Sequence, residues 1–381
     1  MKITDITWFL TTEGNSPALF VKIATDADII GYGEATIHFF PQAVEGMLRD
    51  LKPYLIGEDP ERIEYLWQAC FRRLFMRGGP VTGAAISGID MALWDIKGKA
   101  HDTPVYQLLG GLARKKVRLY GHVTGDTAEE IAERAKERAA RGITAIRFRG
   151  FHVWDRENGH DHQKAVDQQV EFTAAIREAV GDEVDILVEC HGRYDPEWVI
   201  QLAERIAPYK PFFIEDPIRH ENPETMSLVR EKIHLPLAAG ERYHNKWEFR
   251  EIIRNNYVNY IRPDVCHCGG ITEMRKIAAM AETNYISVIP HNNAGPLGTA
   301  ASLHASLAIA NVVLMEAPFV NRDAKGTDIV KPFPVVENGY ALPLEGPGLG
   351  IEFDEETAAR TPFKPRQMPK LDAPDGSVRD W

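Results

Sequence analysis

The sequence predicts an α/β fold in which a βα barrel follows a smaller α+β domain. Three glutamates close short apolar runs at a constant interval of 26 residues: Glu189 in DILVECHG, Glu215 in PFFIEDP and Glu241 in PLAAGER. A short apolar run that ends in a polar residue is typical of a buried parallel strand. An interval of roughly 25 residues holds one strand and one crossover helix. Because 381 residues exceed what one hydrophobic core usually serves, a second domain is expected.

Residues 1–115 lack this interval and are expected to form the α+β domain. Strands are predicted at residues 4–10, 18–25 and 29–35, followed by helices at residues 41–52, 60–75 and 81–100. The last helix has an apolar stripe beside small residues that allow close packing.

Strands and helices then alternate over residues 116–330. The strands are predicted at residues 117–123, 145–151, 185–191, 212–217, 236–241, 260–265, 287–292 and 313–319. Eight parallel strands make one closed barrel, whose active site lies at the C-terminal ends of the strands. The Pro-rich residues 331–381 are expected to return to the first domain.

Composition excludes several classes of partner. A net charge of −11 argues against nucleic acid and anionic membranes, which require a clustered basic face. The N-terminus lacks the apolar core of a signal peptide, so a cytoplasmic protein that binds a small molecule is expected. Cys266 and Cys268 flank a histidine, but alternate positions on one short segment cannot complete a tetrahedral zinc site.

The three glutamates predict a metal site. Unpaired carboxylates in a barrel mouth repel one another and take up protons, whereas one Mg²⁺ per subunit neutralises them and keeps positions open for substrate. Helix capping or salt bridging is the alternative for any single glutamate, and three glutamates in phase favour the metal.

Further polar residues continue the interval, namely Asp264, His291 and Glu316, which follow at spacings of 23, 27 and 25 residues. An aspartate one strand before a histidine can orient the imidazole as a general base, although a structural histidine is the alternative. His191 follows Glu189 by two residues, so strand alternation places it on the same side, as a general acid. Together these groups predict α-proton abstraction with loss of a β-leaving group, which is dehydration for a polyhydroxy acid.

Several motifs resemble the mandelate racemase subgroup of the enolase superfamily, over essentially the whole chain. They are ECHGR, IEDP, AAGER, PDVCHCGGITE, PHNNAGP, GYGEA, FMRGGP and GIDMALWDIKGK, and they look most like sugar-acid dehydratases of the galactonate and gluconate type. This resemblance implies a modified TIM barrel of the (β/α)7β kind, with an N-terminal cap that the C-terminal segment completes. It also implies an even-numbered homo-oligomer.

The resemblance implies roles at matching positions. The metal ligands are Glu189, Glu215 and Glu241, the base is His291 with Asp264, and the acid that expels the 3-hydroxyl is His191. Glu316 is expected to bind the substrate carboxylate, and further substrate contacts are expected from Arg77, His122, Arg147, Arg149 and Asn292. His122 and the loop residues His152, His160 and His162 are weaker candidates for contacts to sugar hydroxyls, and an ordinary loop role is the favoured alternative for each.

Two positions depart from the family pattern. Glu189 stands where many relatives have aspartate. Arg147 and Arg149 stand where racemases of the subgroup have lysines, and a guanidinium is a poor base. This favours a one-base elimination, a lyase reaction that converts an aldonate to a 2-keto-3-deoxy acid. The alternatives are an epimerase or cycloisomerase acting on a related sugar acid, and a metal-binding member without catalysis.

Overall fold

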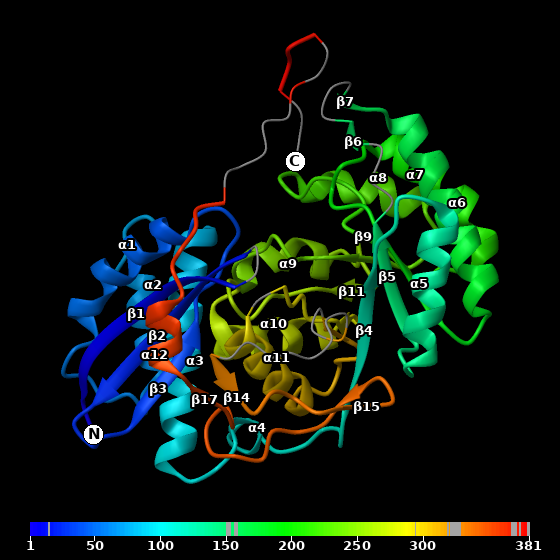
Figure 1. Cartoon of the computed structure of the whole chain (residues 1–381). Coiled ribbons are helices and arrows are strands. Elements are labelled where there is room, and N and C mark those ends of the chain that lie inside the picture. Colours follow the sequence, from blue (N-terminus) through cyan, green and yellow to red (C-terminus); the bar gives the residue numbers. More distant parts are fainter. Residues whose placement is uncertain are drawn as a thin grey trace.

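The chain forms a barrel and an N-terminal cap that lie side by side (Figure 1). The computed structural model describes all residues except 14–15, 150–153, 156–158, 294, 318–319, 321–328, 367–371, 373–374 and 379–381. Parallel strands alternate with helices around the barrel, which confirms the predicted α/β class.

The cap consists of an antiparallel sheet covered by helices. Its strands are β1 (Ile3–Glu13), β2 (Ser16–Thr25) and β3 (Ile30–Glu34), and its helices are α1 (Pro41–Leu51), α2 (Ile63–Arg72) and α3 (Pro80–Ala100), with the 3-10 turn η1 at Lys52–Tyr54. Helix α3 is buried along most of its length because it packs between the sheet and the barrel. Glycines on both α3 and β3 permit this close approach. A Cβ on Gly33 of β3 would lie 2.1 Å from the carbonyl oxygen of Gly88 in α3.

Eight parallel strands form the barrel in the described part of the chain. They are β4 (Val117–Val123), β5 (Ala145–Arg149), β8 (Asp185–Glu189), β9 (Phe213–Glu215), β10 (Leu237–Ala239), β11 (Tyr260–Ile261), β12 (Ser287–Val288) and β13 (Met315–Glu316). Each coincides with a predicted strand, and the strands from β4 to β12 pair in chain order. Pairing of β13 with β4 and a bridge from Val288 to Val312 close the barrel.

Helices follow seven of these strands and cover the outside of the barrel. They are α5 (Ala128–Ala140), α6 (His162–Val180), α7 (Pro196–Ile206), α8 (Met226–Lys232), α9 (Lys246–Arg254), α10 (Gly270–Glu282) and α11 (Pro296–Ala308). This is the expected (β/α)7β arrangement. Smaller elements are α4 (Val105–Leu108), the hairpin of β6 (Trp154–Asp155) and β7 (Gly159–His160), and the 3-10 turns η2 (Ala207–Tyr209) and η3 (Pro223–Thr225).

The C-terminal segment joins both parts of the molecule. Its elements are β14 (Val330–Lys331), β15 (Val336–Glu337), β16 (Tyr340–Ala341), β17 (Glu352–Phe353) and α12 (Glu355–Arg360). Strand β16 pairs with the beginning of β4, an addition to the barrel that the Pro-rich sequence did not indicate. The chain then reaches the cap, where Glu355 contacts Lys22 and Tyr32, at 2.6 Å each.

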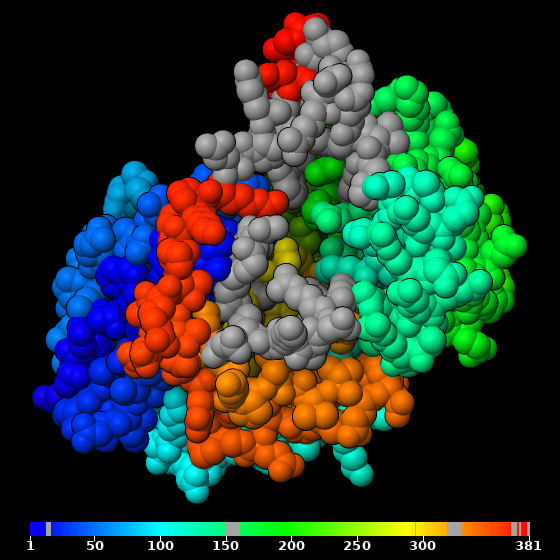
Figure 2. All heavy atoms as spheres, viewed as in Figure 1, coloured from blue at the N-terminus to red at the C-terminus, as the bar shows by residue number. Residues whose placement is uncertain are grey.

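An apolar layer fills the barrel below the mouth. Its buried residues come from seven strands or their ends: Tyr120, Ala145, Leu187, Phe213, Ala238, Ile289 and Leu314. Side chains further along the same strands rise above this floor into the mouth. The surface is hollowed between the blue cap and the green barrel helices (Figure 2). Among the described residues, no helix combines the length and apolarity needed to cross a bilayer.

Candidate active site

Strand register places the predicted metal ligands at one level of the barrel mouth. Arg149 of β5 pairs with Glu189 of β8, and Glu189 pairs with Glu215 of β9. Both glutamates are fully buried. Glu241 follows β10 and completes the predicted trio, and its side chain is 11% exposed.

Two of the three predicted ligands lie in a compact group that could hold a metal ion. Ligand atoms of Glu189, His191 and Glu241 all lie within 4.8 Å of one another. Glu215 stands beside this group, with its Oε1 turned toward Arg147 at 3.1 Å and Arg262 at 2.6 Å. Its Oε2 is buried without a hydrogen-bond donor among the described residues.

The donor set fits a hard dication. Carboxylate oxygens are the ligands that Mg²⁺ prefers, and a buried carboxylate oxygen without a donor is an available lone pair. Burial raises the pKa of Glu189 and of Glu215, even though arginines oppose this shift. A cation at this position would therefore compensate carboxylates that otherwise tend to take up protons.

Two buried arginines bridge the carboxylates at the base of the mouth. Arg147 contacts Glu189 at 2.6 Å and Glu316 at 3.5 Å. Arg262, which is fully buried, donates to Glu316 at 2.7 Å. Arg147 was expected to bind substrate, but its guanidinium faces the protein's own carboxylates. Burial opposes the ionised form of Glu316, yet the arginines and His291 outweigh it and hold its pKa well below the usual range.

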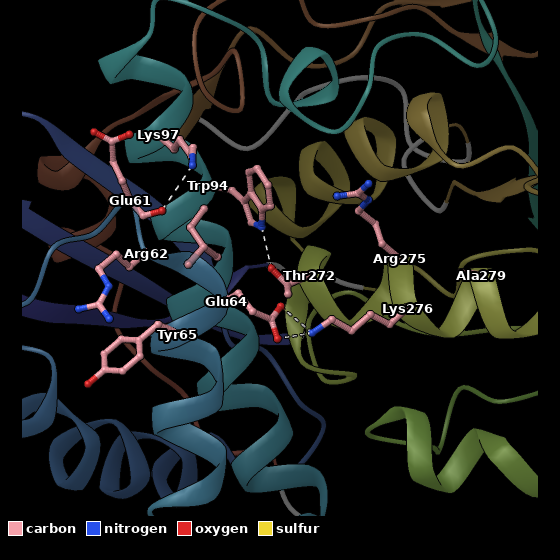
Figure 3. A pocket seen from close by; sticks show the side chains of 11 residues that line it. Glu61, Arg62, Glu64, Tyr65, Trp94, Lys97, Thr272, Arg275, Lys276 and Ala279 are labelled. Atoms are coloured by element: carbon pink, nitrogen blue, oxygen red, sulfur yellow. Dashed lines mark hydrogen bonds and ion pairs between the residues drawn. The ribbon is translucent and has the colours of Figure 1, made fainter.

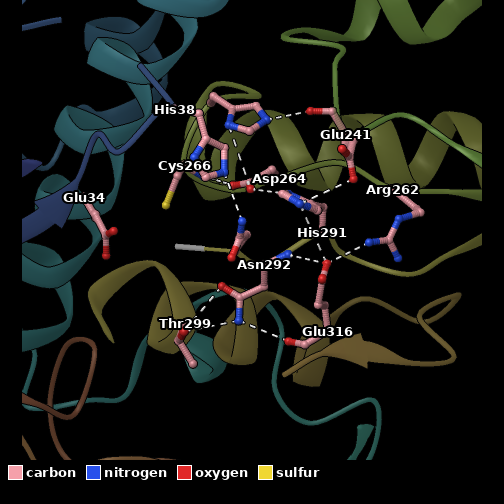
Figure 4. Close-up of polar contacts among 12 residues, drawn as sticks. Glu34, His38, Glu241, Arg262, Asp264, Cys266, His291, Asn292, Thr299 and Glu316 are labelled. Carbon is pink, nitrogen blue, oxygen red and sulfur yellow. Dashed lines mark hydrogen bonds and ion pairs between the residues drawn. The ribbon is translucent and has the colours of Figure 1, made fainter. Parts of the chain in front are cut away.

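Asp264 and His291 form a hydrogen-bonded pair at neighbouring strand ends. Nδ1 of His291 lies 2.6 Å from Oδ2 of Asp264, and a backbone bridge joins the two residues (Figure 4). The other ring nitrogen, Nε2, faces the mouth, 3.4 Å from Glu241. The Asp264 carboxylate also accepts the N–H of Cys266 at 2.7 Å, which fixes its orientation.

The charges around His291 favour its protonated form in the structure as it stands. Burial opposes the imidazolium, but Glu241, Glu316 and Asp264 outweigh it and raise the pKa of His291 to about 10. Because Glu241 is the strongest of these influences, whatever neutralises Glu241 returns the imidazole toward its neutral form.

His191 lies on the other side of the same carboxylate. Its Nε2 is 3.7 Å from Oε1 of Glu241, whereas His291 faces Oε2. A positive φ of 53° turns the chain here, and the N–H of His191 donates to Glu189 at 2.7 Å. Burial lowers the pKa of His191 well below its ordinary value, although Glu241 opposes this.

Two other predicted residues, His122 and Asn292, contact Glu316. Nε2 of His122 lies 2.7 Å from one of its oxygens, and the N–H of Asn292 donates to the other at 3.0 Å. The amide of Asn292 also donates to Thr299 and to the main-chain carbonyl of Glu316. In these contacts His122 and Asn292 hold Glu316, so their expected contacts with substrate stay predictions.

The remaining predicted residues are dispersed. Arg149 is exposed at the end of β5, and no ion pair or side-chain hydrogen bond joins its guanidinium to the rest of the described chain. The structure does not bring Arg77 to the others, because its guanidinium donates to the carbonyls of Arg72, at the end of α2, and Leu74, in the loop that follows. His162 stacks on Trp198 at the start of α6. His152 and the side chain of His160 lie outside the described residues.

The sequence reasoning missed residues that belong to this site. Arg262 precedes Asp264 by two positions, so strand alternation counted back from Asp264 could have located it. His38 follows β3 in the cap, and its Nε2 lies 3.0 Å from Nδ2 of Asn293 in the loop after His291. No sequence interval links His38 with Asn293, because the contact joins two domains.

Comparisons with known proteins find relatives over the whole length of the chain. Residues 3–110 match the mandelate racemase/muconate lactonizing enzyme N-terminal domain, and residues 130–357 match the enolase C-terminal domain-like family. The chain is 39% identical to a D-galactonate dehydratase of Pectobacterium atrosepticum over 390 aligned positions, and 38% identical to one of Verminephrobacter eiseniae over 393, with all of each chain covered.

A solved structure gives the same result. A candidate galactarate dehydratase of Agrobacterium radiobacter, an enolase with sodium and L-malate bound, is 31% identical to the chain. It superposes with a TM-score of 0.91, and 99% of each chain is covered. The chain is therefore a member of the enolase superfamily, in its mandelate racemase/muconate lactonizing enzyme family.

Proposed function

We propose that the chain is a hydro-lyase that dehydrates an aldonate of the galactonate type to its 2-keto-3-deoxy acid with the help of Mg²⁺. The observation that carries this proposal is the position of two histidines on the two oxygens of Glu241, His191 on one and His291 on the other. The full-length similarity to D-galactonate dehydratases supports the reaction class. D-galactonate is accordingly the first substrate to test.

His291 is the proposed general base. Its Nε2 removes the proton from C2 of the substrate, and the electron pair of that C–H bond moves into the adjacent carboxylate to give an enediolate. Asp264 fixes the tautomer by accepting the proton on Nδ1, so the free lone pair points into the mouth. A base that is oriented on a strand end is held within reach of one face of the substrate.

Three carboxylates are proposed to hold the metal ion: Glu189, Glu215 and Glu241. When bound there, Mg²⁺ stabilises the second negative charge that the substrate carboxylate acquires. Arg147 and Arg262 keep Glu215 and Glu316 in place from below. The low pKa of Glu316 favours its ionised form, and a carboxylate can only accept hydrogen bonds, so its proposed role toward the substrate carboxylate requires a bridging donor.

His191 is the proposed general acid. It gives its proton to the 3-hydroxyl oxygen, the C3–O bond breaks, and water leaves with the electron pair of that bond. The resulting enol takes a proton at C3 and becomes the 2-keto-3-deoxy acid. Because burial lowers the pKa of His191, its proton must be held by Glu241 and by the anionic substrate.

The direct test is a screen of aldonates for keto-acid formation, read out as semicarbazone absorbance with and without Mg²⁺. The proposal expects a semicarbazide-reactive product from D-galactonate or a close stereoisomer, and only with Mg²⁺ present. If no aldonate in the library yields a keto acid at high enzyme concentration, the proposed reaction is wrong.

An epimerase is the second candidate, and one observation weighs against it. Epimerisation requires a second base on the opposite face of C2. The residues on β5 that would supply it are Arg147, which is paired with carboxylates, and Arg149, which is also a guanidinium. Epimerisation would appear as a C2 stereoisomer without keto acid.

A further inference from the structure

Two helices of the barrel follow the proposed catalytic pair, and neither has an N-cap side chain of its own. Helix α10 follows Asp264 and has Gly269 at its N-cap, and α11 follows His291 and has Gly295 there. By contrast, α5, α6 and α9 are capped by the side chains of their own N-cap residues, which are Thr127, Asp161 and Asn245. The first backbone N–H groups of α10 and α11 therefore need partners from elsewhere.

The cap supplies a buried carboxylate to α11. Glu34, the last residue of β3, accepts the N–H of Gly295 at 2.7 Å on Oε1 and the N–H of Gly298 at 2.9 Å on Oε2. Thr36 donates to the same Oε1 at 2.7 Å, which orients the carboxylate. Glu34 is fully buried and lies on the cap side of the site (Figure 4). One side chain of the cap thus fixes the helix that begins five residues after His291.

The cap supplies a second buried carboxylate to α10. Oδ2 of Asp90, in α3, accepts the N–H of Thr272 at 3.0 Å. One turn earlier in α3, Ser87 accepts the N–H of Gly269 at 2.9 Å, and one turn later Trp94 donates to the hydroxyl of Thr272 at 2.9 Å. Trp94 and Thr272 line a groove of 590 Å³ on the outside of this junction (Figure 3). A stripe of α3 therefore holds the segment that follows Asp264.

Both junctions leave no room for a side chain on the barrel. A Cβ on Gly295 would lie 2.9 Å from Oε1 of Glu34, and a Cβ on Gly270 would lie 2.3 Å from Oδ2 of Asp90. Gly270 also has a φ of 79°, which favours glycine. The glycines of the barrel and the carboxylates of the cap thus form two matched contacts.

We propose that Glu34 and Asp90 are positioning residues: by capping α11 and α10 from the other domain, they set the geometry of the Asp264–His291 pair. The pair is joined by one hydrogen bond and one backbone bridge, and each partner is followed directly by a helix that the cap holds. Loss of either capping carboxylate shifts Asp264 relative to His291. This inference rests on the proposed base role of His291.

The primary test is Glu34→Gln, because an amide can accept only one of the two N–H groups. A displacement on the order of 1 Å at a reacting group can cost about 100-fold in rate. We expect kcat to fall about 10- to 100-fold, with KM and Mg²⁺ affinity within about twofold of wild type. Hydrogen exchange should accelerate in the peptide that contains Gly295 and Gly298. Asp90→Ala should act in the same way on kcat, with faster exchange at Thr272.

Asp95→Asn is the matched control. Asp95 is buried in the same helix and accepts the N–H groups of Tyr32 and Leu349, but it caps neither α10 nor α11. Its loss should lower thermal stability while kcat stays within about twofold of wild type. Gly295→Ala approaches the contact from the barrel side and should reproduce the kcat loss of Glu34→Gln.

Two results would overturn the inference. One is a normal kcat in Glu34→Gln and Gly295→Ala, and the other is an equal fall of kcat in Asp95→Asn, which would mean a general effect of stability. Failure of the proposed function is seen separately, because the wild-type chain would then form no keto acid. Hydrogen exchange at the starts of α10 and α11 would still compare the four variants in that case.

Discussion

Glu241 joins the proposed acid and base, since His191 and His291 face its two oxygens at 3.7 and 3.4 Å. Burial opposes the ionised form of Glu241, but the two histidines outweigh it and lower its pKa. The carboxylate therefore stays charged at neutral pH and is available to a metal ion. The same charge raises the pKa of His291, so metal binding and base strength are coupled through one residue.

Replacement of His291 tests the base directly. His291→Asn removes the lone pair that takes the C2 proton, so we expect keto-acid formation to fall at least 1,000-fold, about the contribution of a positioned general base. Mg²⁺ binding, measured by calorimetry, should persist because the three glutamates remain. His101→Asn is the control, because His101 is paired with Glu61 on the surface. Normal turnover in His291→Asn would exclude the assigned role.

Replacement of His191 should separate the two proton transfers. His191→Asn keeps the base, so the C2 proton of D-galactonate should still exchange with solvent deuterium, while keto-acid formation falls at least 100-fold. Proton NMR follows both processes in one sample. Loss of exchange together with dehydration would assign His191 to the first step instead.

At the scale of single residues, the sequence predicted the positions of side chains better than it predicted the groups that they contact. The strand interval placed Glu189, Asp264 and His291 at the barrel mouth because parallel strands end at one face. For Arg147 the family resemblance gave a position on β5 at the site, but whether its guanidinium meets substrate or carboxylate depends on distances across the barrel. The sequence of a single strand does not contain these distances.

At the scale of elements, helix α3 does more than its sequence pattern indicates. The apolar stripe and small residues predicted a tightly packed helix, and the structure confirms the helix over Pro80–Ala100. The pattern did not reveal that Asp90 caps a helix of the barrel. Such a contact joins residues 182 positions apart, and no local periodicity records it.

The burial of Asp90 predicts a pH dependence of stability. Burial raises the pKa of Asp90 from 3.8 to about 7, although hydrogen bonds from Thr272 oppose this. Between pH 3.8 and 7 the folded chain holds a proton that the unfolded chain has released, so the free energy of unfolding falls as pH rises through this window. A shift of this size corresponds to at most about 4 kcal/mol.

Asp90→Asn cannot titrate and should lack this dependence. The Tm of wild type minus the Tm of Asp90→Asn should therefore be lower at pH 8 than at pH 5. Glu64→Gln serves as a control, because Glu64 forms a surface pair with Lys276. A difference between wild type and Asp90→Asn that is the same at both pH values would mean that Asp90 does not titrate in this range.

At the scale of the whole molecule, the barrel was predictable and the closure of the cap was only partly so. Eight apolar runs that alternate with helical segments specify a closed barrel, since each strand buries both faces. The C-terminal segment was expected to reach the cap, yet residues 336–341 first add a hairpin to β4. Two-residue strands leave too short an alternation to recognise. The even-numbered oligomer stays a prediction.

Metal binding should stabilise the whole chain. A ligand that binds the folded state at 100 times its Kd contributes about 2.7 kcal/mol, which is several degrees in Tm. We expect Mg²⁺ to raise Tm by this amount and EDTA to reverse the shift and abolish turnover. Glu189→Gln should show a much smaller shift, whereas the surface variant Glu64→Gln keeps it. An unchanged Tm at millimolar Mg²⁺ would contradict the three-glutamate site.

The reaction of D-galactonate in D₂O with Mg²⁺, followed by proton NMR, tests the central claim most directly. A one-base dehydration predicts a 2-keto-3-deoxy acid with one deuterium at C3, and no C2 epimer in the recovered substrate. Deuterium at C2 in an epimerised sugar acid, with no keto acid formed, would contradict the account and assign the site to epimerisation.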